Sequence, residues 1–217
     1  MSDERLIPPT LLFTFSVPCL HIPEIWNADL ELPEQYRLPS FGELDGRELF
    51  ADVRLGWNDQ GLAVSARVSG KKKAAWCRQS RLTDSDGLSL LIDSRNTRQI
   101  HRASRFCHRF VLLPHGHGRN LQQPVVELEP IQRALANPLN PKPQSTKIRA
   151  EKRIDGYILR AAISADAITG YDPSESRELG FSYVVLDQEL GWQSFNTGPD
   201  FPIFADPSLW GMLELID

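Results

Sequence analysis

The chain has 217 residues and a formal net charge of −4, with 24 Lys and Arg side chains against 28 Asp and Glu. A chain of this length can bury most of its unfolded surface in one core without disulfide support. The acidic balance argues against a general nucleic-acid binder. No apolar run approaches the roughly 20 residues of a membrane span. Composition therefore predicts a globular protein that has neither nucleic acid nor a membrane as its partner.

The N-terminus and the cysteines bear on the compartment. The first five residues carry two acids, and the apolar stretch that follows is broken by prolines, which is a poor pattern for an export signal. Cys19, Cys77 and Cys107 are an odd number of cysteines without metal-ligand spacing. We therefore expect three free thiols in a reducing cytoplasm, with no bound metal and no cofactor.

Strict alternation of apolar and polar residues dominates the chain. It runs through residues 51–57 and 62–68 on either side of a turn at 58–61, which predicts a β-hairpin. The pattern predicts further strands over residues 86–93, 106–113, 147–154, 157–163, 180–186 and 210–216. Helical signals are few, and only two short helical turns are expected, at 131–136 and after Ser164.

Many short strands separated by turn residues predict an all-β fold, an antiparallel β-sandwich with long loops and little helix. We expect a single domain over residues 1–217. Residues 1–47 would form an N-terminal strand and loop extension packed on it. The Pro-rich stretch 130–143 is interpreted as a long surface loop, because the strands before and after it look like halves of one core.

Several segments in order resemble a known family. They are residues 50–58 with 61–64, 86–93, 156–163, 179–187 and 206–211. In this order they resemble the family 9 carbohydrate-binding modules and the related DOMON-like sandwiches, over roughly residues 48–217. The resemblance implies a carbohydrate-binding-module-like sandwich that binds a saccharide without cleaving it. Such modules accompany enzymes of polysaccharide or oligosaccharide catabolism.

The resemblance also implies a binding site. In the family a sugar is held between two aromatic rings, and the matching residues here are Trp76 and Phe204. Arg109 matches a ligand-binding arginine. Ser89 and Val184 stand where the family carries Glu and Gln, so two polar partners are lost. We therefore expect neutral sugars to bind weakly and an acidic sugar to be favoured by the surrounding arginines.

Alternation supports an outward position for the arginine of this site. Arg109 alternates with Phe110 and Leu112, so it lies on the opposite face of its strand. If the apolar residues fill the core, the guanidinium points outward, where its fork can bind a sugar hydroxyl or carboxylate.

Residues 94–126 contain six arginines, four of the five histidines, and no Asp or Glu. Guanidinium groups recognise carboxylates, phosphates and sulfates. The alternative function is therefore a protein-interaction or scaffold domain that binds an acidic partner through this segment. The simpler interpretation is a solvated loop whose arginines pair with carboxylates elsewhere in the chain.

Other clusters give weaker signals. Residues Lys71–Lys73 are interpreted as a solvated hairpin end. His115 and His117 flank a glycine and suggest a turn. No common catalytic motif is present, so no enzyme activity is expected. The least favoured class is an enzyme that uses Cys77 or Cys107 with a nearby histidine.

Overall fold

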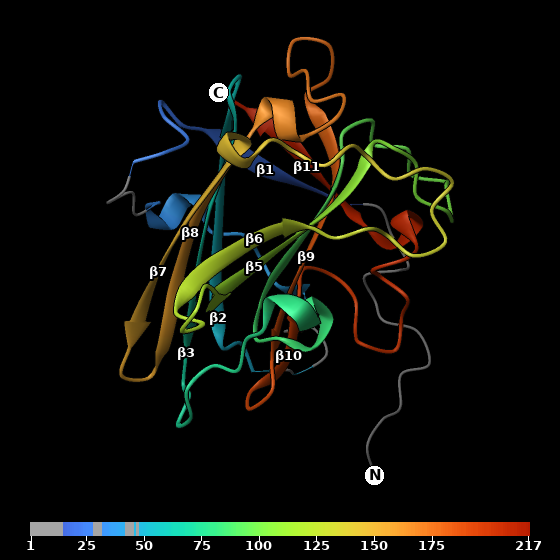
Figure 1. Cartoon of the computed structure of the whole chain (residues 1–217). Helices are drawn as coiled ribbons and strands as arrows, with labels where there is room; N and C mark the ends of the chain where they lie inside the picture. Colours follow the sequence, from blue (N-terminus) through green and yellow to red (C-terminus); the bar gives the residue numbers. More distant parts are fainter. Residues whose placement is uncertain (1–14, 28–31, 42–45, 47) are drawn as a thin grey trace.

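Eleven strands form one continuous sheet in the computed structural model, which describes residues 15–27, 32–41, 46 and 48–217 (Figure 1). Neighbours along the sheet follow the order β6-β5-β4-β9-β11-β1-β2-β3-β8-β7, and β10 pairs with β9. The strands are β1 Ser16–His21, β2 Ala51–Asn58, β3 Gly61–Ser69, β4 Gly87–Asp93, β5 Cys107–His117, β6 Gln123–Leu128, β7 Thr146–Arg153, β8 Gly156–Ser164, β9 Glu178–Asp187, β10 Gly191–Ser194 and β11 Gly211–Ile216.

The all-β class is confirmed. Helical residues in the described part of the chain belong almost entirely to short 3-10 helices of three to six residues. They are η2 Glu34–Tyr36, η4 Gln79–Asp84, η5 Pro143–Ser145, η6 Ala165–Ala167 and η7 Pro207–Leu209. Within the described ranges, no helix is long and apolar enough to cross a membrane.

Both predicted hairpins form. In the first, Asn58 pairs with Gly61, and in the second, Arg153 pairs with Gly156. Gly61 has a φ of 136°, and a Cβ placed there would lie 2.1 Å from the backbone oxygen of Ile163. Only glycine combines this backbone angle with so close an approach to the neighbouring strand.

The sheet curves around one core, so strands from its two halves pack together. Leu90, Phe110 and Tyr183 from one half belong to the same buried cluster as Val64 and Leu159 from the other. The edge strands β6 and β7 both line a cleft of about 590 Å³. The expected sandwich is not confirmed in that form, because the strands follow a single hydrogen-bonded path.

The antiparallel expectation holds for most strand pairs but is wrong for β1. This strand lies between β11 and β2 and pairs with both in parallel. This strand, which belongs to the N-terminal extension, therefore lies inside the sheet. Its six residues include Pro18 and lack a clear alternating pattern. The sequence therefore did not predict that this strand pairs in parallel with its neighbours.

Loops cover the outer face of β4, β5 and β9. Leu91, Cys107 and Val184 point away from the main core into a second buried cluster that includes Ile131 and Trp210. The stretch 130–143 is a loop, as predicted. The helix expected at 131–136 does not form, and the backbone makes turns instead.

Lys71 corrects the prediction of a solvated hairpin end. Its side chain is buried, and its ammonium nitrogen lies 2.5 Å from Asp187 Oδ2 and 3.1 Å from Asp86 Oδ2. Burial alone lowers the pKa of Lys71, but the hydrogen bonds to the two carboxylates outweigh it, and the net pKa is raised. Lys72 and Lys73 are exposed, as expected.

Candidate functional site

Arg109 lies on β5 and points to the outer face of the sheet, as the alternation predicts. Phe110 is in the main core, whereas Val111 belongs to an outer buried cluster. Ser89 on β4 pairs with Val111. Arg109 is thus the diagonal neighbour of Ser89 on the same face, at about 7–8 Å for such a pair. The structure brings these two predicted site residues together.

The guanidinium of Arg109 lies under the ring of Phe204. Its central carbon is 4.0 Å from the ring centroid, which is a close cation–π contact. Phe204 is far from Arg109 in sequence, and the fold brings the two residues into contact. Trp192 on β10 stands beside Phe204, with ring centroids 5.6 Å apart. Sequence reasoning left Trp192 unassigned, and the short β10 that places it has no alternation signal.

Burial of Arg109 is the unusual feature of this site. The residue is only 7% exposed, and its Nε atom has no hydrogen-bond partner among the described residues. Burial lowers the pKa of Arg109, and the Glu129 carboxylate partly offsets the shift. An arginine remains charged under these conditions. Burial of a cation whose N–H group lacks an acceptor costs free energy, and a hydrogen bond to that group lowers the cost.

The segment that carries Phe204 is held firmly against the sheet. The Trp210 indole N–H donates to the backbone oxygen of Ile203 at 2.8 Å, and Ile203 is fully buried. The Asp206 carboxylate accepts the backbone N–H of Ser208 and caps η7. The ring of Phe204 therefore has a fixed position over Arg109.

Trp76 lies beside the start of β4, the strand that carries Ser89. Its backbone N–H donates to Asp86 Oδ2, and its carbonyl accepts from the Asp86 N–H, both at 2.9 Å. These bonds fix Trp76 beside the start of β4. Its ring contacts two guanidiniums, Arg78 at 5.7 Å and Arg81 at 5.3 Å. The role of Trp76 as a second wall stays a prediction, because the ring seen beside Phe204 is that of Trp192.

Ser89 and Val184 are both nearly buried and pair with each other across β4 and β9. Val184 packs in the outer apolar cluster. The two positions at which the resemblance implies lost polar partners are thus adjacent. The outer face of the sheet is therefore apolar or weakly polar around Ser89 and Val184, and Arg109 is the charged residue near them.

Several arginines of residues 94–126 already have partners within the chain. Arg95 and Arg98 pair with carboxylates of other segments, at 3.4 Å and 3.5 Å. Arg102 donates to a backbone carbonyl. Arg105 lies over the ring of Phe106, 5.0 Å from its centroid. This arrangement matches the simpler interpretation of a solvated segment paired with carboxylates.

The three thiols are buried, and Asp93 has a structural role. All three cysteines are free and buried, as predicted for free thiols. Burial raises the pKa of Cys77 to about 12 and of Cys107 to about 11, which disfavours the nucleophilic thiolate. Asp93 accepts two backbone N–H groups at the end of β4. The described residues contain no group of three or more ligating side chains placed to hold a metal ion.

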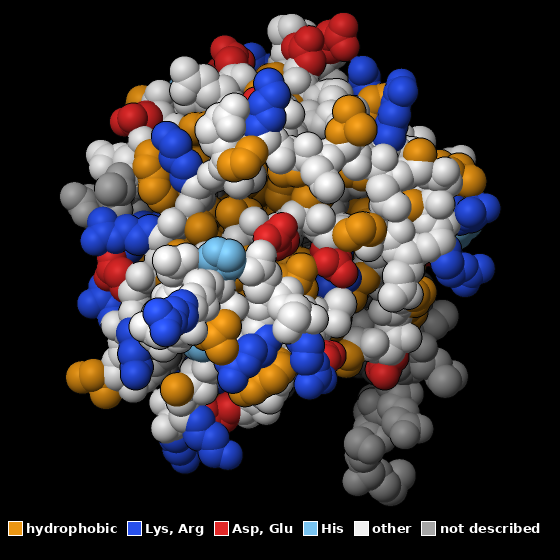
Figure 2. Space-filling model, viewed as in Figure 1, with side chains coloured by type: hydrophobic (Ala, Val, Ile, Leu, Met, Phe, Trp, Pro, Cys, Tyr) orange, Lys and Arg blue, Asp and Glu red, His pale blue; other side chains and the backbone are white. Residues whose placement is uncertain are grey.

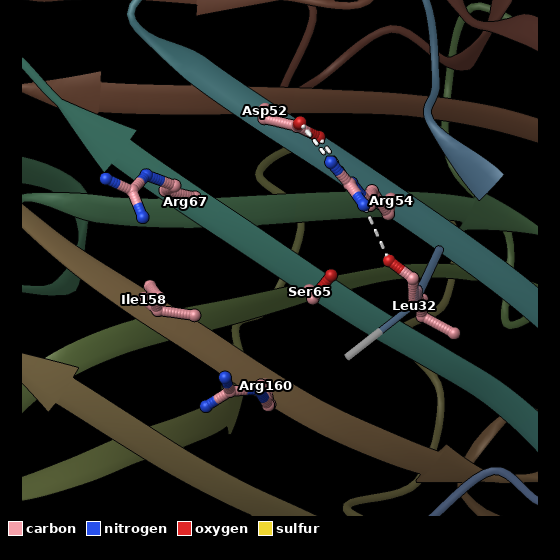
Figure 3. Close-up of a pocket in the computed structure, with 7 residues that line it drawn as sticks. All are labelled: Leu32, Asp52, Arg54, Ser65, Arg67, Ile158 and Arg160. Atoms are coloured by element: carbon pink, nitrogen blue, oxygen red, sulfur yellow. Dashed lines mark hydrogen bonds and ion pairs between the residues drawn. The ribbon is translucent and has the colours of Figure 1, made fainter. Parts of the chain in front are cut away.

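A pocket separate from the Arg109 site lies on the outer face of β2, β3 and β8 (Figure 3). Its volume is about 210 Å³, and three arginines line it. Arg54 donates to both carboxylate oxygens of Asp52 and to the backbone oxygen of Leu32. Arg160 donates to Glu151 at 2.5 Å. Carboxylates thus engage all three of its arginines, since Arg67 lies 3.9 Å from Asp155. Among the described residues, no carboxylate forms an ion pair with Arg109.

Comparison with solved structures shows the fold. A family 9 carbohydrate-binding module from Caldicellulosiruptor kristjanssonii, in complex with cellotriose, matches with a TM-score of 0.60 and 15% identity. The match covers 93% of this chain and 93% of that one. The same module in complex with glucose also gives a TM-score of 0.60, with coverage of 93% and 96%. No family model matches the sequence, and no curated protein does. The chain therefore has a fold similar to that of family 9 carbohydrate-binding modules.

Proposed function

We propose that this protein is a non-catalytic carbohydrate-binding module-like protein. The observation that carries the proposal is the buried guanidinium of Arg109 beneath Phe204, on the outer face of the sheet. Its Nε–H is buried without an acceptor among the described residues, so the guanidinium is incompletely hydrogen-bonded. A saccharide hydroxyl or carboxylate at the exposed edge of the guanidinium supplies an acceptor. The similar modules hold cellotriose and glucose, which supports this class of ligand.

The proposed site consists of Arg109, Ser89 and Phe204, with Trp76 at its border. Phe204 presents a flat apolar ring of the kind that stacks on the C–H face of a sugar, and Trp192 extends that surface. Arg109 is the only charged group in this set, so a sugar that carries a carboxylate gains a charge-assisted hydrogen bond. We therefore expect acidic saccharides to bind more tightly than neutral ones.

We further propose a role in saccharide catabolism inside the cytoplasm. We also propose that the two halves of the curved sheet correspond to the two layers of a sandwich. Three free, buried cysteines support a reducing compartment. Packing of both halves into one core cluster supports the layered description. The scaffold alternative has less support, because Arg95 and Arg98 already pair with carboxylates within the chain.

Calorimetric titration of the full chain with cellotriose, glucose and trigalacturonate tests the proposal. We expect binding that weakens at least tenfold in Arg109→Met and in Phe204→Ala. Arg105→Met and Phe106→Ala are matched controls, because they disrupt a similar cation–π pair outside the site. Absence of binding to all three saccharides, or equal losses in the control variants, would reject the proposed site.

A further inference from the structure

A further cavity, of about 500 Å³, lies beside the turn of the β7–β8 hairpin. Its other walls are the segment after β3 and the region that joins β5 to β6. The described residues that line it include neither Arg109 nor Phe204. This volume is in the range of cavities that hold small organic molecules. In Figure 2, Lys and Arg side chains gather at the lower left, where Figure 1 places these elements.

The lining of this cavity is strongly cationic. Lys72, Lys73, Lys152 and Arg153 line it against a single carboxylate, Glu151. Two arginines already engage that carboxylate, Arg160 at 2.5 Å and Arg153 at 2.8 Å. The three lysines form no ion pair with any described carboxylate and are exposed. Their charges are therefore available to a ligand.

The backbone that carries two of these lysines is held in place. The backbone N–H groups of Lys72 and Lys73 donate to the two carboxylate oxygens of Glu189, at 3.0 Å and 2.9 Å. The preceding Lys71 is buried between two aspartates, and its own N–H donates to the backbone oxygen of Asp155 at 2.9 Å. This segment is thus tied to the turn of the β7–β8 hairpin, so a ligand would not have to order the segment that presents the charges.

The rest of the lining combines apolar surface with an unused polar atom. Ala75, Pro114 and Tyr157 supply apolar area. His115 donates from Nε2 to the backbone oxygen of Ala75 at 2.9 Å, because a carbonyl only accepts. Its Nδ1 is buried and has no partner among the described residues. In the neutral ring Nδ1 is an acceptor, and His115 lines the cavity.

We propose that this lysine pocket, lined by Lys72, Lys73 and Lys152, binds a small organic anion. The lysines select a carboxylate or a phosphate, and the volume and mixed lining suit a hydroxylated body of about the size of a hexose. A sugar acid and a sugar phosphate share this chemistry. The proposal is independent of the saccharide site at Arg109.

The test is calorimetric titration of the full chain at low ionic strength with four probes, namely glucuronate, glucose 6-phosphate, glucose and inorganic phosphate. We expect at least one sugar anion to bind at least tenfold more tightly than glucose and than inorganic phosphate. Binding should weaken in 0.3 M NaCl, because exposed charges are screened. Comparison of the two sugar anions identifies whether the carboxylate or the phosphate is preferred.

Variants assign the binding to this pocket. The triple variant Lys72→Ala, Lys73→Ala, Lys152→Ala should bind at least tenfold more weakly and keep the wild-type circular dichroism spectrum, since all three side chains are exposed. A control triple variant, Arg102→Ala, Arg105→Ala, Lys142→Ala, removes three cations that do not line this cavity and should bind as the wild type does.

Four outcomes would overturn the inference. The first is that neither sugar anion binds more tightly than glucose. The second is that the lysine triple variant binds as tightly as the wild type. Inorganic phosphate that binds as tightly as both sugar anions would show that the cavity contributes nothing beyond charge. Equal weakening in the control triple variant would show that overall charge, and not this pocket, holds the anion.

Discussion

The ammonium group of Lys71 lies among carboxylates in a nearly water-free environment. Asp86 and Asp187 accept its hydrogen bonds, and both are almost fully buried. These carboxylates also accept backbone N–H groups of the turn after β9, from Gln188 and Glu189. The group therefore ties the segment after β3 to β4 and to the β9–β10 hairpin.

Removal of this ammonium should destabilise the protein strongly. Lys71→Met leaves two buried carboxylates without their cation, and breaking a buried ion pair costs about 3–5 kcal/mol of unfolding free energy. Lys72→Met removes an exposed neighbour and should cost less than about 0.5 kcal/mol. Urea unfolding of the two variants measures the difference. Equal unfolding free energies in the two variants would contradict the structural role of Lys71.

At the scale of elements, the outer covering of the sheet decides where a site can form. Ile131 anchors the loop between β6 and η5 in the cluster above Leu91 and Cys107. The N–H of Leu135 in the same loop donates to the backbone oxygen of Ala103 at 2.7 Å. The loop is thus packed on the face that holds Arg109.

Truncation of the loop anchor should be costly although it lies in a Pro-rich stretch. Ile131→Ala removes a buried side chain and should lower the unfolding free energy by about 2–4 kcal/mol. Leu139→Ala in the same loop removes a side chain that is 87% exposed, so its effect should be near zero. Chemical denaturation compares the two, and a neutral Ile131→Ala would show that the loop is not docked.

His108 on β5 makes stability depend on pH. It is fully buried, and its Nε2 accepts the backbone N–H of Thr169 at 2.9 Å. Burial lowers the pKa of His108 to about 4, against 6.5 for an unperturbed histidine. Between these values the unfolded chain binds a proton that the folded protein does not. The unfolding free energy should therefore fall as the pH drops from about 6.5 to about 4.

The size of this effect follows from the pKa difference. At about 1.4 kcal/mol per pKa unit, the loss reaches about 3 kcal/mol. His108→Gln keeps an acceptor for Thr169 but does not titrate, so its stability should vary less over this pH range. His101→Gln, at an exposed position, should behave as the wild type does. If His108→Gln and the wild type lose the same free energy on acidification, this account of His108 is wrong.

The sequence predicted the strands better than it predicted which of their faces are covered by other segments. Alternation placed β2, β3, β8 and most of β9, because each of these strands has one face in the core. It also placed Arg109 on the outer face. It could not show that loops cover that face, since the burial of Leu91 and Cys107 depends on segments distant in sequence. The burial of Lys71 depends on Asp187, which lies far along the chain, and a run of three lysines gives no sign of it.

For the whole molecule, the curved sheet collects distant segments on one outer face. Phe204 and Trp192 come from the last quarter of the chain, whereas Ser89 and Arg109 come from adjacent strands in its middle. The fold similarity to family 9 carbohydrate-binding modules spans 93% of the chain at 15% identity. The similarity shows the fold, and the proposed saccharide site depends on one buried, incompletely bonded arginine on this face.

The most direct measurement follows the Nε–Hε resonance of Arg109 by NMR during a titration of the full chain with trigalacturonate. Arg109→Met identifies the resonance by its loss. Because this N–H has no acceptor among the described residues, a bound saccharide should shift its resonance along a saturable curve, while the Arg105 resonance stays in place. A saccharide that binds without moving the Arg109 resonance, or that does not bind at all, would contradict the proposed site.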